Sequence, residues 1–377
     1  MRVGIIGVGQ IKSEECKKDV FSDQSTLIAK AALADAAIEI GDIDNVVLGE
    51  YDLVTGRTAA HMYTIMGAGG FLKDELRIND DGLFALAQAY AGIMSGSFEK
   101  TLVLSTGISS EGPQELITNM RLDPFFHRHL GLHEKMATAM QALQYREKYQ
   151  VSEKLSAKIA VKNRNNAKVN PYAHLDQGLS IDEVLEADFD CWPLRITERA
   201  PWSDGGCALI LASEAYARRV CQNPIWISGL GWSNETYYMG DKDLTQLTSV
   251  KYAAQRAYKM AGIKNSATEI DIAELFDLTT YHEMMTCEAL GFCEKGKGKY
   301  LADEGFTEIG GQLPVNPSGG VLSSNPMSAS GLTRLVECVL QLQGRASDHQ
   351  VTDAATGLAQ SISGYGAQRA CTVIVRR

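Results

Sequence analysis

Hydrophobic and polar positions follow the same order in two separate parts of the chain. Residues 3–8 form a β-branched apolar run that predicts a strand, and residues 25–52 continue with an amphipathic helix, an acidic turn and a second strand. From residue 225 the order returns, with a strand near 225–232, a helix at 249–263 and a strand at 269–277. Each part therefore predicts a β-α-β unit.

A second pair of similar segments follows these two units. Residues 80–107 and 329–357 both begin with a polar residue and Gly-Leu, continue as an apolar helix and end in a strand. Self-similarity on this scale predicts a duplicated α/β fold in which helices pack on a mixed sheet. We expect an N-terminal half at 1–224 and a C-terminal half at 225–377, packed together as one unit.

Two long segments interrupt this pattern. The first, at about 112–200, is rich in Met, His and Tyr before it becomes helical, and it lies within the N-terminal half. A connection of this length is typical of a lid or binding loop, although it could also serve only to complete a dimer surface. The second segment, residues 290–320, has no counterpart in the first half.

Composition restricts the class of protein further. The chain has 377 residues, of which 45% are hydrophobic and 22% charged, and its formal net charge is −10. An acidic chain argues against binding to nucleic acid or to an anionic membrane. The eight cysteines show no metal-ligand or disulfide spacing, and no apolar run is long enough for a signal peptide or a membrane span. We expect a cytoplasmic protein without a metal site.

The turn at residues 79–81 is the first candidate for chemistry. It joins a predicted strand to an apolar helix and consists of Asn79, Asp80 and Asp81, without a nucleophile. The two aspartates could cap the helix through its free N–H groups, or they could take part in a reaction.

Seven motifs, in this order, resemble the thiolase superfamily and within it the sterol-carrier-protein-type thiolases. They are VGIIGVGQ, DDGLFALAQA, KIAVKNRNNAKVNPYAH, PWSDGGCALILASEAYA, LGFCEKGKGK, PVNPSGG and ASGLTRLVECVLQLQGRA. The resemblance covers the whole chain. It implies two βαβαβαββ halves in a layered α-β-α-β-α core, with a coenzyme A thioester bound under the inserted lid and no covalently bound cofactor.

The resemblance also implies four catalytic positions, and all four are changed. Asn79 stands where the family has its nucleophilic Cys, Phe276 where it has one His, and Asn325 where it has the His that acts as base. Tyr365 lies in the C-terminal glycine loop that would supply a second acid or base. An amide is no nucleophile at neutral pH and does not titrate, so a Cys acyl-enzyme is not expected here.

Each of the other site candidates can also be explained without a role in catalysis or binding. Tyr281 and His282 are the nearest titratable groups, although such a His is often only a satisfied buried residue, and Tyr365 could contact substrate or simply pack. We expect coenzyme A to be bound by residues of the lid and of the glycine-containing loops, although a solvated or interface residue is the favoured explanation for His133. These candidates are His133, Ser318, Gly319, Gly364 and Gly366.

The resulting hypothesis is an acyl-CoA-binding subunit of a complex that makes or breaks a C–C bond, with Asn79, Asn325 and backbone N–H groups polarising the thioester carbonyl. The resemblance implies a homodimer or a heterodimer with a thiolase-like chain, and a partner with an OB-fold and a zinc ribbon that holds acyl-CoA. The alternative is a catalytically inactive structural or regulatory partner of an active thiolase-like chain. A third, an acyltransferase that uses Cys287 or Cys293, is also open.

Overall fold

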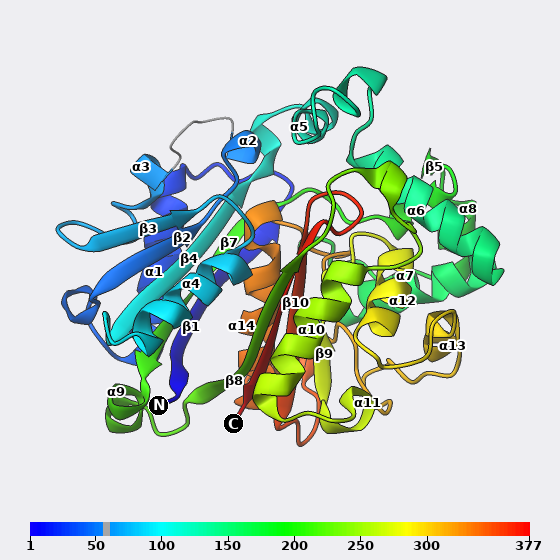
Figure 1. The fold of residues 1–377 in the computed structure, drawn as a ribbon. Coiled ribbons are helices and arrows are strands. Elements are labelled where there is room, and N and C mark those ends of the chain that lie inside the picture. The colour runs from blue at the N-terminus through cyan, green and yellow to red at the C-terminus, as the bar shows by residue number, and fades with distance from the viewer. Residues whose placement is uncertain (56–60) are drawn as a thin grey trace.

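The computed structural model describes residues 1–55 and 61–377 of the protein. Its central sheet has nine strands in the order β3-β2-β4-β7-β1-β8-β11-β10-β9 (Figure 1). The strands are β1 (Val3–Glu14), β2 (Asn45–Gly49), β3 (Asp74–Ile78), β4 (Lys100–Ile108), β7 (Asp204–Ser213), β8 (Ile225–Asn234), β9 (Ile272–Glu274), β10 (Thr356–Ser363) and β11 (Arg369–Arg376). The predicted mixed α/β fold is confirmed.

The strand order shows the duplication directly. Counted outward from the middle, β1, β7, β4 and β2 of the N-terminal half correspond to β8, β11, β10 and β9 of the C-terminal half. In each half the first and last of these strands in the chain, β1 with β7 and β8 with β11, pair antiparallel. Among the described strands, the two wings of the sheet, one from each half, are hydrogen-bonded to each other where β1 pairs with β8, over three residue pairs. The sheet therefore has a pseudo-twofold relation centred on that pairing.

Glycines in the two central strands let a helix pack unusually close on each wing. A Cβ at Gly9 of β1 would lie 2.6 Å from the backbone N of Ala32 in α1 (Phe21–Ala36). A Cβ at Gly231 of β8 would lie 2.2 Å from the backbone O of Ala253 in α10 (Thr248–Ala261). Gly9 and Gly231, which lie in the first strand of each half, therefore allow a helix to pack closely on that strand.

Two helices form the central layer between the wings. They are α4 (Gly82–Met94) and α14 (Ser330–Leu342), which contact each other and the inner faces of both wings. Every residue of α14 is buried, and α4 buries most of its length. The helix α4 is apolar on nearly all sides, as expected of a helix with a sheet on either side, whereas α14 also buries Arg334 and Glu337, which are paired with Glu274 and His349.

Outer helices cover the remaining faces of the sheet. On the N-terminal wing lie α1 and α9 (Glu214–Val220). On the C-terminal wing, α10 buries Val250, Ala253, Ala254 and Ala257, the spacing of a one-sided amphipathic helix. It is accompanied by α11 (Ser266–Glu269) and α12 (Thr280–Ala289). The order of layers is helix, sheet, helix, sheet, helix.

The insert predicted at about 112–200 is mainly helical and runs from the top of Figure 1 to its right-hand side. It contains α5 (Gln114–Met120), α6 (Glu134–Tyr149), α7 (Glu153–Ala167) and α8 (Ile181–Glu186), followed by a hairpin of β5 (Phe189–Cys191) and β6 (Leu194–Arg195). The remaining short helices are α2 (Asp52–Thr55), α3 (His61–Thr64) and α13 (Gly298–Asp303). Three-residue 3₁₀ helices begin at Ile40, Ser109, Arg128, Ile196, Met239, Met327 and Ser347.

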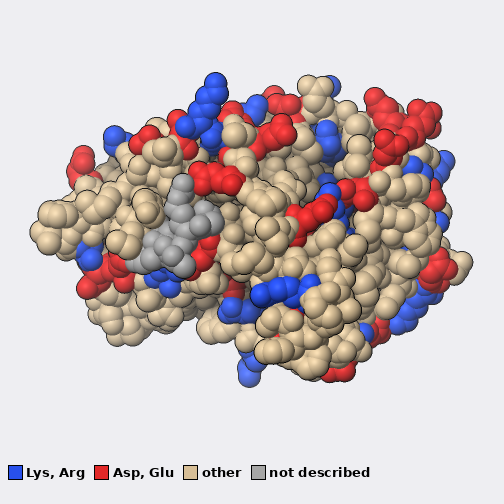
Figure 2. Space-filling view, turned by 90° about the horizontal axis from the view of Figure 1, so that it is seen from above, with Lys and Arg blue, Asp and Glu red and all other residues tan. Residues whose placement is uncertain are grey.

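The face seen from the side of the insert carries both signs of charge. In Figure 2 acidic and basic side chains are interspersed over this face, with uncharged surface between them. Within the described residues, none of the helices combines the length and the apolar character that a membrane crossing requires.

Candidate functional site

The turn between β3 and α4 holds Asp81, a residue that is hydrogen-bonded to both halves of the molecule. Asp81 is the N-cap of α4, and its Oδ1 accepts a hydrogen bond from the backbone N of Leu83 at 2.9 Å. Its Oδ2 accepts one from the backbone N of Gly331, in the first turn of α14, at 2.8 Å. A single buried carboxylate thus holds the N-termini of both central helices, and burial raises the pKa of Asp81 to about 7.

Asp80, the preceding residue, forms a polar cluster with side chains from both halves. Its Oδ1 lies 3.1 Å from the hydroxyl of Tyr51, and its Oδ2 pairs with the guanidinium of Arg369. The Tyr51 hydroxyl is also 3.0 Å from Oγ of Ser363, the last residue of β10. Burial and then the charge of Asp80 raise the pKa of Tyr51 well above its usual value, so this hydroxyl keeps its proton and acts as a donor.

This cluster adjoins a small, partly open space that we call the elbow cavity. The cavity measures about 30 Å³, enough for one or two water molecules. Beside it lies an open depression of about 320 Å³, the mouth, which also includes Asn79, Asp80 and Arg369. Both are lined by Tyr51, Arg121, Ser363, Gly364 and Tyr365, so the mouth leads to the elbow cavity.

The insert covers the elbow cavity through two contacts. The Tyr365 hydroxyl donates a hydrogen bond to the backbone O of Thr118 in α5 at 2.7 Å, and burial raises the pKa of this phenol. The guanidinium of Arg121, just after α5, lies 4.5 Å from the ring centre of Tyr51 and 5.9 Å from that of Tyr365. The insert therefore has the position expected of a lid.

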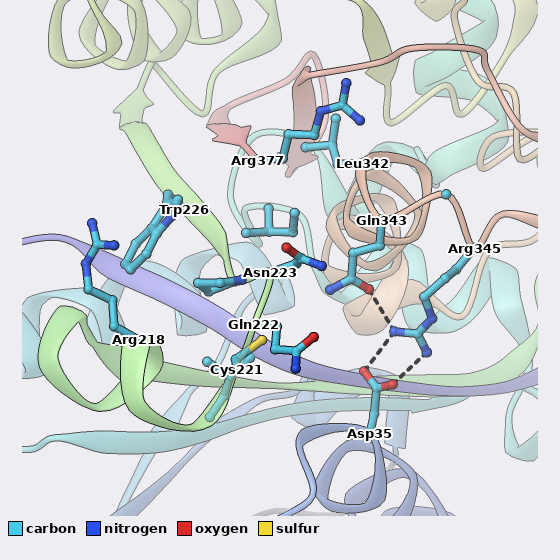
Figure 3. A pocket seen from close by; sticks show the side chains of 14 residues that line it. Asp35, Arg218, Cys221, Gln222, Asn223, Trp226, Leu342, Gln343, Arg345 and Arg377 are labelled. Carbon is cyan, nitrogen blue, oxygen red and sulfur yellow. Dashed lines mark hydrogen bonds and ion pairs between the residues drawn. The ribbon is translucent and has the colours of Figure 1, made fainter.

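A larger cavity lies elsewhere and holds none of these groups. Figure 3 shows this space of about 780 Å³, which is near the C-terminal end of α14, whereas the elbow is at its N-terminal end. Its carboxylate, Asp35, is already paired with Arg345 at 2.6 Å. We place the candidate site at the elbow because convergent polar groups with perturbed pKa values, rather than volume, mark reactive sites.

Metal binding has no donor set in the described part of the chain. Over residues 1–55 and 61–377, no three His, Cys, Asp or Glu side chains gather in a group that could hold an ion. The charges at the elbow are balanced by arginines and backbone N–H groups instead.

Comparison with known proteins finds relatives along the full length. Residues 231–377 match a family model described as thiolase C-terminal domain-like. Acetyl-CoA acetyltransferase of Methanothermobacter thermautotrophicus is 29% identical, covering 99% of each chain. Sterol carrier protein 2 of Homo sapiens is 30% identical, covering 97% of this chain and 70% of that protein.

The chain belongs to the thiolase superfamily. The fold agrees with that of other thiolase-like proteins: a chain of the Ltp2-ChsH2(DUF35) aldolase structure superimposes with a TM-score of 0.86 at 22% identity, covering 100% of this chain and 97% of that one. A benzoylsuccinyl-CoA thiolase subunit of Thauera aromatica is 31% identical over 56% of this chain and 55% of its own.

Three of the four residues predicted to stand at catalytic positions lie at the elbow. Asn79 is exposed in the mouth, where its Oδ1 accepts a hydrogen bond from the backbone N of Asp52 at 3.3 Å. Phe276 and Tyr365 line the elbow cavity. Asn325 is fully buried behind the lining residue Met327, whose Sδ is 3.7 Å from Asn325 Nδ2. Whether these are the positions of thiolase catalysis stays a prediction.

The two titratable candidates on α12 lie inside the C-terminal half. His282 is buried, with Nδ1 2.8 Å from Thr279 Oγ1 and Nε2 3.2 Å from Gln141 Oε1. Burial lowers its pKa to about 4, so the imidazole is neutral. Tyr281 packs edge-on against Tyr145 in the same core. Neither residue lines the elbow cavity or the mouth.

The coenzyme A candidates are spread over the molecule. Gly364 lines both spaces at the elbow, and the backbone O of Gly366 accepts a hydrogen bond from Lys242 Nζ at 3.3 Å. His133 immediately precedes α6 in the lid, and its buried Nδ1 has no hydrogen-bond partner among the described residues. The glycine loop thus belongs to the elbow, while His133 lines neither space.

Ser318 and Gly319 lie in a different part of the core. The Ser318 Oγ donates to Glu274 Oε2 at 2.7 Å, and Arg334 of α14 donates to the same hydroxyl. Gly319 has a φ of +99° and packs against Ala167, where a Cβ would come within 2.5 Å of the alanine methyl. Their visible role is to join the lid helix α7 and α14 to the sheet.

Sequence reasoning missed Tyr51, Arg121 and Arg369. Tyr51 lies two positions after the end of β2, and β2 runs parallel to β3, so the residues just after one strand lie beside the turn after the other. That adjacency could have been inferred from the strand order. Arg121 comes from an irregular part of the insert and carries no such signal.

Proposed function

We propose that this chain binds an acyl-CoA and makes or breaks a C–C bond next to the thioester, without forming a cysteine acyl-enzyme. The observation that carries the proposal is the pair formed by Tyr51 and Asp80, 3.1 Å apart at the elbow. The names of the relatives support the substrate class, because they include two thioester-processing activities, and the solved structure of similar fold is called an aldolase.

The nearby thiols support a mechanism that does not use them. Cys371 lies 3.7 Å from the backbone O of Leu83 in α4, and Cys207 lies 3.4 Å from Thr333 Oγ1 in α14. Both side chains are fully buried, and burial raises both pKa values, that of Cys207 to about 12. A protonated thiol enclosed in the core is a poor nucleophile. No cysteine lines the elbow cavity or the mouth.

Cleavage of a β-hydroxyacyl thioester illustrates the proposed chemistry. Asp80 accepts the proton of the β-hydroxyl group, with the Tyr51 hydroxyl as the relay between them. The bond between Cα and Cβ then breaks, the hydroxyl-bearing carbon leaves as a carbonyl product, and the electron pair remains on the thioester as an enolate. Asn79 and the backbone N–H groups of the loop around Tyr365 stabilise the enolate oxygen, with Asn325 behind them, until a proton returns to Cα.

We also propose that the chain works in a complex. One relative is named as a subunit, and the aldolase structure is named for two components, Ltp2 and ChsH2(DUF35). In the described part of the chain, β3 is an edge strand of the sheet. Exposed apolar side chains lie on the segment before it and on the strand itself, namely Met62, Met66, Phe71, Leu72 and Leu76. We therefore place a dimer contact with a second thiolase-like chain, identical or not, at this edge.

The second proposed partner is an OB-fold, zinc-ribbon protein that holds the acyl-CoA, and the proposed location is the cytoplasm. Free cysteines are consistent with a reducing compartment, because all eight thiols in this chain are unpaired.

An inactive partner subunit is the second candidate function. The observation in its favour is the size of the elbow cavity, about 30 Å³, which is far below the volume that small-molecule sites usually have. In this case the lid contacts of Tyr365 and Arg121 would keep the elbow closed, and the chain would support an active thiolase-like subunit.

One experiment separates the two candidates. The purified chain, alone and with the product of its adjacent gene, is incubated with panels of β-hydroxyacyl-CoA and β-ketoacyl-CoA, and chain-shortened products are measured by chromatography. Cleavage that is lost on Tyr51→Phe supports the enzyme. Thioester binding without turnover in any pairing would reject it in favour of the inactive subunit.

A further inference from the structure

Arg121 is a charged residue without a charged partner. In the described part of the chain its guanidinium forms neither an ion pair nor a hydrogen bond, and its contacts are with the rings of Tyr51 and Tyr365. Burial acts to lower the pKa of this group, but the surrounding tyrosines and carboxylates raise it on balance, so it stays protonated. A cation in this position is available to an incoming anion.

The carboxylates that line the two spaces at the elbow are bound to other groups. Glu134 lies 3.3 Å from Arg199 and 3.4 Å from the indole N–H of Trp202. Oδ1 of Asp123 accepts two backbone hydrogen bonds, from residues 125 and 126, both at 2.9 Å. Asp80 is held by Arg369 and by the Tyr51 hydroxyl. None of the three is hydrogen-bonded to Arg121.

Stacking alone does not satisfy this guanidinium. Ring contacts use the flat faces of the group, whereas its five N–H donors point outward in the plane. That planar fork matches a carboxylate, which can accept two parallel hydrogen bonds from it. Arg121 lines both the elbow cavity and the mouth, so its position is next to Tyr51 and Tyr365.

We propose that Arg121 binds a free carboxylate on the acyl group of the thioester, and that the substrate class is therefore acyl-CoA with a dicarboxylic acyl chain. The inference rests on the proposed function, since it assigns the substrate of the same site. A phosphate of coenzyme A has the same attraction for a guanidinium. The carboxylate is favoured because Arg121 lines the mouth together with Tyr51 and Asp80, the proposed acid–base pair, at the reacting end of the ligand.

The test compares matched ligands by equilibrium binding to the full chain. The ligands are 3-hydroxyacyl-CoA thioesters with four to six acyl carbons, each prepared with a methyl end and with a carboxylate end, together with free coenzyme A. We expect the wild type to bind one carboxylate-ended thioester about tenfold or more tightly than its methyl-ended match, the usual effect of a charge-assisted hydrogen bond. Arg121→Gln removes this preference, and Arg121→Lys, which keeps the charge without the fork, retains part of it.

A matched control removes the same charge elsewhere. Arg218 is mostly exposed and pairs with Glu214 on its own helix, so Arg218→Gln should leave the preference unchanged. Melting temperatures of all variants report whether the lid has been disturbed.

The outcomes separate this inference from the function on which it rests. Equal affinity for both ligand ends in the wild type, or equal weakening of both by Arg121→Gln, overturns the inference alone. Weaker binding of free coenzyme A by Arg121→Gln assigns Arg121 to a phosphate and also overturns it. If neither kind of thioester binds to the wild type, the proposed function fails as well.

Discussion

Replacing Asp81 measures how strongly one carboxylate joins the two halves of the molecule. Asp81→Ala leaves two buried backbone N–H groups, those of Leu83 and Gly331, without an acceptor. Each such group costs about 1–3 kcal/mol when it is buried and unpaired. The loss is partly offset at neutral pH, because the variant no longer buries a carboxylate. We expect the free energy of unfolding to fall by about 2–4 kcal/mol near pH 6.

The pH dependence gives this prediction a sign. The pKa of Asp81 is raised from 3.8 to about 7, so the protonated carboxyl stabilises the fold fully below pH 3.8. That stabilisation is lost as the pH rises through about 7, and its upper limit is about 4 kcal/mol. The amide side chain of Asp81→Asn does not titrate in this pH range. The stability of the wild type relative to Asp81→Asn should therefore decrease between pH 4 and pH 8.

The assay is urea unfolding followed by circular dichroism at several pH values, with Asp303→Asn as a surface control. The side chain of Asp303 is about half exposed and is paired with Lys158, away from the elbow. A cost below about 1 kcal/mol for Asp81→Ala, or a difference from Asp81→Asn that stays constant with pH, would refute this account of the joint between α4 and α14.

Three further predictions concern single residues. Tyr51→Phe keeps the ring under Arg121 but removes the hydroxyl. The kcat for thioester cleavage should therefore fall about a hundredfold or more, with little change in KM. An unchanged kcat would exclude Tyr51 from proton transfer. His349 is buried, with Nε2 3.1 Å from Glu337 Oε2. Burial acts to lower the pKa of this imidazole, but the Glu337 carboxylate raises it on balance. The stabilisation that this pair gives the fold is therefore present below pH 6.5 and is lost at higher pH. His349→Gln should therefore cost roughly 1–3 kcal/mol near pH 5.5 and less at pH 8, and the opposite order in urea unfolding would show that the ion pair is not formed. Asn79→Cys should give no thiolysis of β-ketoacyl-CoA, because no basic side chain replaces the missing histidines, and clear activity would mean that the elbow has been misinterpreted.

The fold was predictable because the duplication repeats a physical pattern. The apolar residues of 249–263 recur on one face, which is typical of an outer helix. The helix at 82–94 is almost wholly apolar, which is typical of a central helix. The pairing of β1 with β8 was not predictable, since only three residue pairs form it and neither strand carries a signal that selects the other. Tertiary contacts decide such a pairing.

The site was less predictable, because its groups meet only in the folded chain. Tyr51 and Ser363 are separated by 312 positions, yet their hydroxyl oxygens lie 3.0 Å apart. Family resemblance directed attention to Asn79 and Tyr365, and both line the mouth. His282 was a candidate only because an imidazole can titrate. The sequence could not show that this imidazole is enclosed by two hydrogen bonds and that burial keeps it neutral.

The most direct test of the central claim is a single incubation analysed by mass spectrometry. The chain, with the product of its adjacent gene, is mixed with a β-hydroxyacyl-CoA, and the intact protein and the small molecules are measured together. We predict that chain-shortened products accumulate while the mass of the protein stays that of the unmodified 377-residue chain. An acyl group attached to any of its cysteines during turnover would contradict the account.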